Sequence, residues 1–545
     1  MSAAGTVQAT ARRSGGGGAS GGPRHLAGTG VLLRLALRRD RVMLPVWVLV
    51  LGTLVVSGNG SIAALYPTAA DRAALAASMT ANSSLRSLYG PVFGDSVGAL
   101  VAWRFGVFAA VLAAVMSLIV VVRHTREEEE TGRQEMLSAA MVGRRAPLTA
   151  ALLAALVANT ALALIITAGL AGRGAGGALA LGLAVGLTGM VFATAAAVAA
   201  QLTEGARLAK GLTAAVLGAA FTLRAAGDAG DAAGGSLLTW LSPVGWAENV
   251  RAFAGDRWWV LLLPVAAVLL QGLTAYELAS RRDVGMSFLP SRPGPAEGRL
   301  ATAGALAWRL QRGGLAGWTV GFLAAGAVFG GMVEGAADLV GQNEQAREIF
   351  QRMGGAQALS DAFLSALLGL FGMVASLYAV GSVLRLHGEE TSQRAEPLLA
   401  APVGRLRWAA GHLVIAFGGS VLLLLAAGTG MYLSYGRDFG GVLAAAAVQL
   451  PAVWLLGGVA VLLHGAVPRA AVAAWAVAGL AVAVGWVGPA LDLPQAVLNL
   501  SPFGHLPKLP GAAMEWPPVL VLTAGAALLV AAGLAGLRRR DLVTA

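Results

Sequence analysis

Apolar segments of about 20 residues or more recur along the whole chain, and they constrain its fold more than any other feature. A helix of that length crosses roughly 30 Å of hydrocarbon, and in lipid every backbone polar group must be satisfied inside the protein. The composition agrees, because 57% of the 545 residues are hydrophobic and only 12% are charged. The sequence therefore predicts an all-α polytopic membrane protein.

The first half of the chain, residues 28–281, contains six of these segments. A Gly- and Ser-rich stretch at 1–27 precedes it and is predicted to be a disordered tail. Residues 28–41 alternate leucines with arginines, which predicts an amphipathic helix in the membrane interface. We expect spans near residues 42–64, 97–122, 147–170, 177–200, 207–226 and 257–280.

The second half, residues 301–545, follows the same course after a Pro-, Gly- and Arg-rich linker at 282–300. An interfacial helix is expected at 301–314. We expect spans near residues 315–336, 361–385, 407–433, 439–463, 469–490 and 517–537. The fold class predicted is two parallel six-helix transmembrane halves, with about 12 spans in total.

A charged segment between the second and third spans occurs once in each half. Residues 128–144 align without a gap with residues 389–405, at an offset of 261 (389 − 128 = 261). A second stretch, LSPVGW at 241–246, recurs as LSPFGH at 500–505. Repeats in the same order indicate duplicated halves. The identical positions of the charged segment include Glu128/Glu389, Glu129/Glu390, Arg133/Arg394, Glu135/Glu396, Leu137/Leu398 and Arg144/Arg405.

The distribution of charge predicts the orientation. Most Lys and Arg residues fall in the tails, the linker and the loops that share a side with the two Glu-rich segments. Because cytoplasmic loops collect basic residues, both termini are expected in the cytoplasm and the protein in the plasma membrane. The net charge of +11 then fits contact with anionic membrane lipid, and no nucleic-acid partner is expected.

Catalytic and metal sites are not expected in this chain. A P-loop needs Gly-Lys followed by Ser or Thr, whereas Lys210 precedes Gly211 and Lys508 precedes Leu509. There are no cysteines, and the six histidines lack the spacing of metal ligands. The sequence therefore predicts no cofactor, no metal and no enzymatic activity of its own.

The Glu-rich segments are predicted to be docking helices. Glu129 with Arg133, and Glu390 with Arg394, have the i,i+4 spacing of a favourable helix pair, but such a pair contributes only about 0.2–0.5 kcal/mol. A charged turn followed by an apolar turn suits a groove on a soluble partner. A loop that serves only topology would gain little from consecutive glutamates.

This pattern resembles the coupling helices of ABC-2 type permeases, which contact the ATP-binding subunit. The duplicated form resembles the fused permeases of actinobacterial exporters of polyketide antibiotics. The resemblance implies coupling roles for the repeated residues. It also implies two cytoplasmic ATPase copies that bind ATP and Mg, and export of an apolar or amphipathic drug, antibiotic or lipid-like molecule. The copies differ at Met141 and Pro402, so the two docking surfaces need not be equivalent.

Two other classes stay open at this point. An ion-coupled secondary transporter with parallel halves would need an ionisable relay in mid-span. The candidate residues lie near span ends: Arg104, Glu204, Glu277, Glu334 and Asp361. A membrane-embedded lipid-linked transferase would need paired carboxylates or a metal cluster on an outer loop, and the spacing of the acidic residues there does not suggest one: Asp228, Asp231 and Asp256. No substrate-binding residues are predicted.

Overall fold

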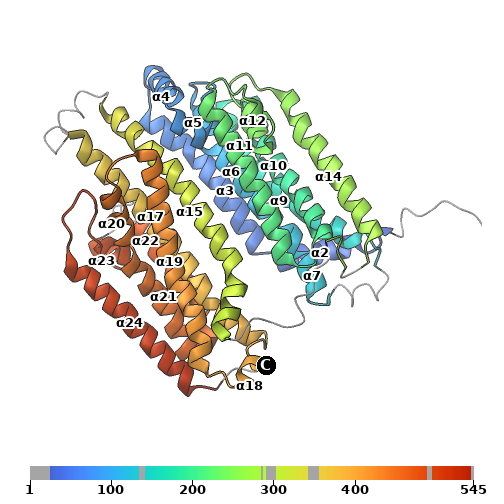
Figure 1. The fold of residues 1–545 in the computed structure, drawn as a ribbon. Helices are drawn as coiled ribbons and strands as arrows, with labels where there is room; N and C mark the ends of the chain where they lie inside the picture. The colour runs from blue at the N-terminus through green and yellow to red at the C-terminus, as the bar shows by residue number, and fades with distance from the viewer. Residues whose placement is uncertain are drawn as a thin grey trace, which may run out of the picture. The chain divides into compact units, whose positions relative to one another are not determined.

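The computed structural model describes residues 25–133, 142–283, 286–289, 302–341, 355–487 and 494–541. The chain divides into two compact units, Met1–Arg292 and Pro293–Ala545. Eleven helices within the described ranges are long and apolar enough to cross a membrane. Helices account for nearly all of the regular structure there, in agreement with the predicted all-α class (Figure 1).

Unit 1 is organised around helix α10 (Ala175–Leu202), which packs against α6, α9 and α14. Its glycines allow this close approach: a Cβ at Gly189 would lie 1.9 Å from Oδ1 of Asn159 on α9. The other helices of unit 1 are α2 (Thr29–Arg39), α3 (Met43–Leu65), α4 (Ala69–Ala81), α5 (Ser83–Tyr89), α6 (Val97–Arg123), α7 (Arg126–Glu130), α9 (Ala146–Leu170), α11 (Ala206–Gly230), α12 (Leu237–Trp240), α13 (Pro243–Asn249) and α14 (Leu262–Arg281).

Unit 2 also packs its long helices through small residues. Gly326 and Gly330 of α15 lie against the backbone of α19, and Gly465 of α21 lies against Gly533 of α24. The helices of unit 2 are α15 (Ala303–Gly341), α17 (Gly355–Thr391), α18 (Glu396–Ala400), α19 (Arg405–Tyr435), α20 (Phe439–Ala447), α21 (Leu450–Ala466), α22 (Ala473–Val487), α23 (Gln495–Leu498) and α24 (Trp516–Arg539).

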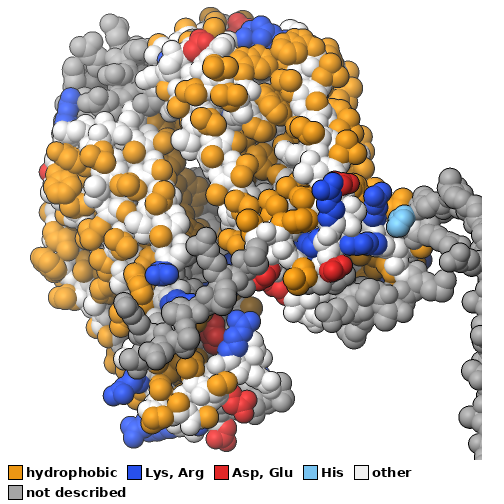
Figure 2. All heavy atoms as spheres, turned by 45° about the vertical axis from the view of Figure 1, so that its right-hand side comes forward, with side chains coloured by type: hydrophobic (Ala, Val, Ile, Leu, Met, Phe, Trp, Pro, Cys, Tyr) orange, Lys and Arg blue, Asp and Glu red, His pale blue; other side chains and the backbone are white. Residues whose placement is uncertain are grey.

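The outer helices keep large hydrophobic side chains on the surface. The helix α14 is apolar enough to cross a membrane, and its residues Leu269, Leu270 and Leu273 are each more than 60% exposed. Figure 2 shows hydrophobic side chains over most of the surface in view, with charged side chains gathered in a few patches. A largely apolar surface is expected of a protein that lies in lipid.

Two elements differ from the sequence prediction. The separate interfacial helix expected at 301–314 is absent, because α15 runs without a break from Ala303 through the following span. In unit 1 the helix α2 ends before Asp40. The corresponding residue of unit 2 is Gln311 (311 − 40 = 271), which lies within α15. Its buried side chain hydrogen-bonds to the side chains of Ser382 and His412 on neighbouring helices.

The other difference concerns the span expected near 469–490. Its helix, α22, has 15 residues and falls short of the length that a straight crossing needs. A 3-10 turn at Pro468–Ala470 precedes it, since proline cannot continue the preceding helix. The structure thus has eleven candidate spans in its described part, where about 12 were expected. The predicted tail falls outside that part except for residues 25–27, and so does most of the linker.

Candidate functional site

The four consecutive glutamates at 127–130 contact different elements of unit 1. Glu128 pairs with Arg39 of α2. Glu127 pairs with Lys210 of α11. The charged turn α7 therefore holds together segments that are far apart in the sequence.

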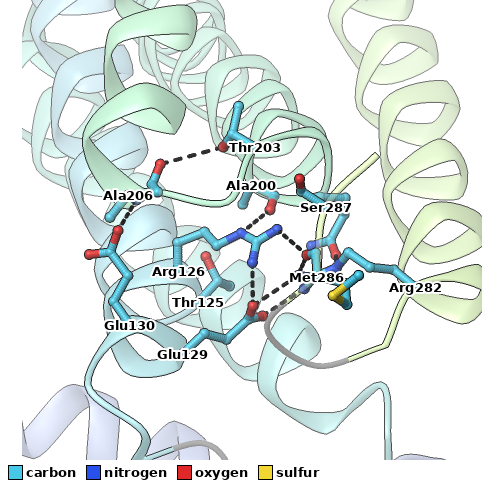
Figure 3. A network of polar contacts seen from close by, with 12 residues as sticks. Thr125, Arg126, Glu129, Glu130, Ala200, Thr203, Ala206, Arg282, Met286 and Ser287 are labelled. Atoms are coloured by element: carbon cyan, nitrogen blue, oxygen red, sulfur yellow. Dashed lines mark hydrogen bonds and ion pairs between the residues drawn. The ribbon is translucent and has the colours of Figure 1, made fainter. Parts of the chain in front are cut away.

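Glu130 completes this set at the beginning of α11. Its Oε1 accepts a hydrogen bond from the backbone N–H of Ala206 at 2.7 Å (Figure 3). Ala206 is the first residue of α11, so the carboxylate meets an N–H group that has no partner within the helix. A carboxylate at a helix N-terminus is also favoured by the helix dipole.

Glu129 is the most buried of the four, with 5% of its side chain exposed. Arg282 holds it in a bidentate pair, with Nη1 at 2.8 Å from Oε2 and Nη2 at 2.6 Å from Oε1. Arg126 donates to the same carboxylate at 2.5 Å, and its guanidinium also donates to the carbonyl oxygens of Ala200 and Met286 (Figure 3). Two arginines and one carboxylate thus join α7 to the ends of α10 and α14.

Unit 2 repeats this arrangement around Glu390, whose side chain is 3% exposed. Arg540 donates to it in a bidentate pair, with both N···O distances at 2.6 Å. His464 of α21 is the next basic neighbour, with Nε2 at 3.7 Å from Oε2. Glu129 and Glu390 are equivalent positions of the repeated segment, and both are buried in bidentate arginine pairs.

A third residue of the repeat completes each cluster. Arg144 donates through Nη2 to the carbonyl oxygen of Arg282 at 2.6 Å. Arg405, the equivalent of Arg144, donates through Nη1 to the carbonyl oxygen of Arg540 at 2.5 Å. We call Glu129, Arg282 and Arg144 the unit 1 cluster. The unit 2 cluster is Glu390, Arg540 and Arg405.

The two pairing arginines were not predicted from the sequence, although a signal for them exists. Arg282 is the C-cap residue of α14, and Arg540 is the C-cap residue of α24. Both stand in an Arg-Arg-Asp sequence, at 281–283 and at 539–541, with an offset of 258 (539 − 281 = 258). Each cluster therefore ties the Glu-rich segment to the end of the last long helix in its unit.

The i,i+4 pairs predicted within the repeat do not form. Arg133 lies 3.7 Å from Glu128 and is half exposed, while Glu129 is held by Arg126 and Arg282. The reason is local: α7 ends at Glu130, so Glu129 and Arg133 do not share one helix. In unit 2 the helix ends at Thr391, and Gln393 has a positive φ of 58°, which turns Arg394 away from Glu390.

The residues of the second repeat that come after the turn at Gln393 are mostly exposed. Arg394 and Glu396 are exposed, and so are the small apolar residues within α18 and directly after it. Leu398 and its neighbour Leu399 are half-buried, because they pack against the core of unit 2. Glu389 lies beside Arg385, with 3.7 Å between the charged atoms. In the first repeat, Glu135 and Leu137 lie outside the described residues.

Asp40 ties α2 to the same end of unit 1. Its fully buried carboxylate lies 2.8 Å from Nη1 of Arg123 and 2.6 Å from Nε2 of His124. Both partners stand at the end of α6, directly before the Glu-rich turn. The break between α2 and α3 is therefore fixed by the end of α6 that leads into the Glu-rich turn α7.

A second buried charge group lies at the opposite end of α11. Arg224 is fully buried and lies 3.3 Å from both Asp228 and Glu248. It also donates to the carbonyl oxygens of Ser87 and Leu88. Burial raises the pKa of Glu248 well above its ordinary value of 4.5, and the Arg224 guanidinium opposes that shift. These residues were not paired from the sequence, since Arg224 lies within the span expected near 207–226 and Asp228 lies after it.

The ionisable residues first considered for a relay lie in separate places. Arg104 stacks over the ring of Tyr89 at 4.1 Å. Glu277 is 57% exposed and pairs with Arg281. Glu204 lies in the short turn between α10 and α11, and Asp361 lies in a cavity of unit 2. The side chain of Glu334 is outside the described residues.

Asp228, Asp231 and Asp256, the acidic residues first considered for a transferase site, have separate hydrogen-bond partners. Asp231 accepts hydrogen bonds from the backbone N–H groups of Ala233 and Gly235. Asp256 accepts one from the backbone N–H of Phe253. These carboxylates therefore stabilise their own loops, and Asp228 belongs to the Arg224 group.

Comparison with known proteins gives two matches. Residues 300–538 match the family described as the C-terminal domain of the multidrug efflux system permease Rv1217c. Over 526 residues the chain is 45% identical to the multidrug efflux system permease protein Rv1217c of Mycobacterium tuberculosis (strain ATCC 25618 / H37Rv). The alignment covers 94% of this chain and 95% of that protein.

Proposed function

Because this chain belongs to the family of multidrug efflux system permeases that includes Rv1217c, we propose that it is the membrane permease of an ATP-binding cassette exporter. The identity over nearly the whole length confirms the resemblance found in the sequence. In this proposal the chain is a multi-pass membrane protein that moves drug-like amphipathic molecules out of the cell. It does not hydrolyse ATP itself.

The duplicated Glu-Arg-Arg cluster is the observation that carries the ATP-driven part of the proposal. A permease that takes its energy from a separate ATPase needs a rigid connection between the docking segment and the transmembrane helices. Each cluster supplies one, since Glu129 and Glu390 lie at the Glu-rich segments and Arg282 and Arg540 cap the last long helices. Charge-assisted bidentate pairs in buried surroundings fix geometry well.

The clusters also change which residues are assigned to docking. Glu128 and Glu129 have partners within unit 1, and Glu390 has one within unit 2, so these carboxylates serve the connection. Arg394 and Glu396 are exposed and stand on either side of the turn into α18. We assign the contact with the ATPase to these exposed residues and to the equivalent stretch of the first repeat.

The proposed partners are two copies of a cytoplasmic ATPase, one for each Glu-rich segment, which would bind ATP and Mg. Both termini would then face the cytoplasm. The absence of a Gly-Lys-Ser or Gly-Lys-Thr sequence supports placing nucleotide binding in another chain. Membrane lipid surrounds the apolar surface in this proposal (Figure 2).

The docking assignment is tested by reversing charge on the exposed turn. The double variant Arg394→Glu/Glu396→Arg should keep the stability of the purified permease, because exposed substitutions usually change it by less than about 0.5 kcal/mol. It should lose most of the stimulation of a co-expressed ATPase. The matched control is Glu277→Arg, since Glu277 is also exposed and lies on α14.

Full stimulation by the double variant would remove these residues from the interface. Equal loss in the control and the double variant would show a general effect of charge on the complex.

A further inference from the structure

Unit 2 contains a large cavity that no part of the proposed coupling machinery uses. Its volume is about 960 Å³, which lies within the range of pockets that hold drug-sized ligands. Asp361 near the beginning of α17 lines it, together with residues of α22 and of the stretch from Gln495 to Ala512. Since α17 is helical throughout, Glu390 lies 29 residues further on, roughly 43 Å away.

Unit 1 has a pocket between the equivalent elements, but it is almost closed. Its volume is about 30 Å³, close to that of one or two water molecules. The equivalence follows from the sequence, because Gly106, Phe108 and His124 recur as glycine, phenylalanine and histidine at an offset of 263 (369 − 106 = 263). Gly106 lines the pocket of unit 1, and its equivalent Gly369 lines the cavity of unit 2.

One pair of equivalent side chains contributes to this difference. Trp103 lines the pocket of unit 1, is 8% exposed and donates through Nε1 to the carbonyl oxygen of Gly90 at 2.9 Å. Its equivalent in unit 2 is Ala366 (366 − 103 = 263), which lines the cavity. A buried indole occupies much of a pocket of this kind, whereas a methyl group leaves the space open.

The lining of the unit 2 cavity is also more polar. Ser365 replaces Ala102, and Asp361 replaces Gly98, both at the same offset of 263. Gln449 replaces Val185 on the neighbouring helices (449 − 185 = 264). A wall with a hydroxyl, a carboxylate and an amide can hydrogen-bond to polar groups of a ligand.

Charge and aromatic surface narrow the class of ligand. The cavity has one carboxylate, Asp361, and one ammonium, Lys508, among its described walls. Trp486 and Phe503 supply aromatic faces, and Asn499 supplies an amide. A carboxylate, an ammonium and aromatic faces in the lining of one cavity suit a planar molecule that carries both an amine and an acid.

We propose that this cavity binds zwitterionic aromatic molecules of drug size, with Lys508 near the acid and Asp361 near the amine. The identification of the ligand as a transported drug rests on the proposed function, whereas binding to the purified permease does not. The two units then differ in role, since the closed pocket of unit 1 cannot accept such a molecule. The exchange of Trp103 for Ala366 is one of the sequence differences that separate the two pockets.

The test measures binding of ciprofloxacin, a fluorescent quinolone zwitterion, to the purified full-length permease without ATPase. Ala366→Trp should weaken binding at least tenfold, because an indole projecting from the wall occupies space that the ligand needs, and Lys508→Gln should weaken it about tenfold. Flumequine is the matched probe, because it keeps the quinolone ring and acid but lacks the amine. Asp361→Asn should remove the preference of the wild-type protein for ciprofloxacin over flumequine.

The control variant is Arg394→Glu/Glu396→Arg, which lies outside the cavity and should bind ciprofloxacin like the wild type. Binding that persists in this variant while ATPase stimulation is lost supports both assignments separately. Unchanged binding in Ala366→Trp and Lys508→Gln, or no saturable binding by the wild type, would overturn the cavity assignment. ATP-independent transport with intact cavity binding would overturn the proposed energy source alone.

Discussion

Removing the arginine of each cluster should destabilise the permease by amounts that depend on the remaining partner of the glutamate. In Arg282→Gln, Glu129 loses two hydrogen bonds at 2.8 and 2.6 Å but keeps Arg126 at 2.5 Å. In Arg540→Gln, Glu390 loses two hydrogen bonds of 2.6 Å, and its contact with His464, at 3.7 Å, is longer than that of Glu129 with Arg126. The variant of unit 2 should therefore be the less stable of the two.

The magnitude follows from burial. Breaking a buried ion pair by removing one partner costs about 3–5 kcal/mol. Glu390 is 3% exposed, so we expect Arg540→Gln to reach that range. Arg126 compensates part of the loss at Glu129, which reduces the expected cost of Arg282→Gln to about 2–3 kcal/mol. For units of this size, about 1 kcal/mol shifts Tm by roughly 2–4 °C.

The assay is thermal unfolding of the purified permease followed by tryptophan fluorescence at one fixed scan rate, because such unfolding is often irreversible. The control is Arg281→Gln. Arg281 neighbours Arg282, but its side chain is 69% exposed and its pair with Glu277 is a surface pair worth about 0–1 kcal/mol. The double variant Glu390→Gln/Arg540→Gln should recover part of the loss seen in Arg540→Gln, since it removes both charges of that pair.

Equal melting temperatures for Arg281→Gln and Arg282→Gln would refute the stabilising role of the unit 1 cluster. If Arg540→Gln is at least as stable as Arg282→Gln, the remaining partner of each glutamate does not determine the loss of stability.

Two further predictions concern other parts of the fold. Because burial raises the pKa of Glu248, the folded state retains a proton that the unfolded state releases above about pH 4.5, so stability should fall as the pH rises through the folded pKa. Glu248→Gln should flatten this profile in pH-dependent melting, whereas Glu277→Gln should leave it unchanged. Gly465→Ala should abolish recovery of folded protein in gel filtration, since its Cβ would lie 1.9 Å from the carbonyl oxygen of Gly533, and Gly479→Ala should be recovered normally because that position is open.

The helices were predictable from the sequence wherever an apolar segment is long enough to cross a membrane. α6, α9, α10, α19 and α24 lie within a few residues of the apolar segments, because a long apolar run in lipid has no alternative to a helix. The continuity of α15 was not predictable in this way. The arginines near its beginning resemble those of α2, and the difference lies in the packing of Gln311 against Ser382 and His412.

The candidate site was predictable only in part. The repeated segment showed that Glu129 and Glu390 belong together, but their arginine partners lie 153 and 150 residues away along the chain. The repeated Arg-Arg-Asp sequence would have suggested Arg282 and Arg540, although nothing in it states which carboxylate they meet. Buried charges such as Arg224 depend on tertiary packing, since carbonyl groups of Ser87 and Leu88 make its burial possible.

In the proposed function, ATP hydrolysed by a partner, and not an ion gradient, drives export through this permease. The most direct measurement is ciprofloxacin transport into inside-out membrane vesicles that contain the permease and its ATPase, with and without ATP and with and without a protonophore. The account predicts uptake that requires ATP, survives the protonophore and is lost in Arg394→Glu/Glu396→Arg. Uptake that proceeds without ATP and collapses with the proton gradient would contradict it and favour an ion-coupled transporter.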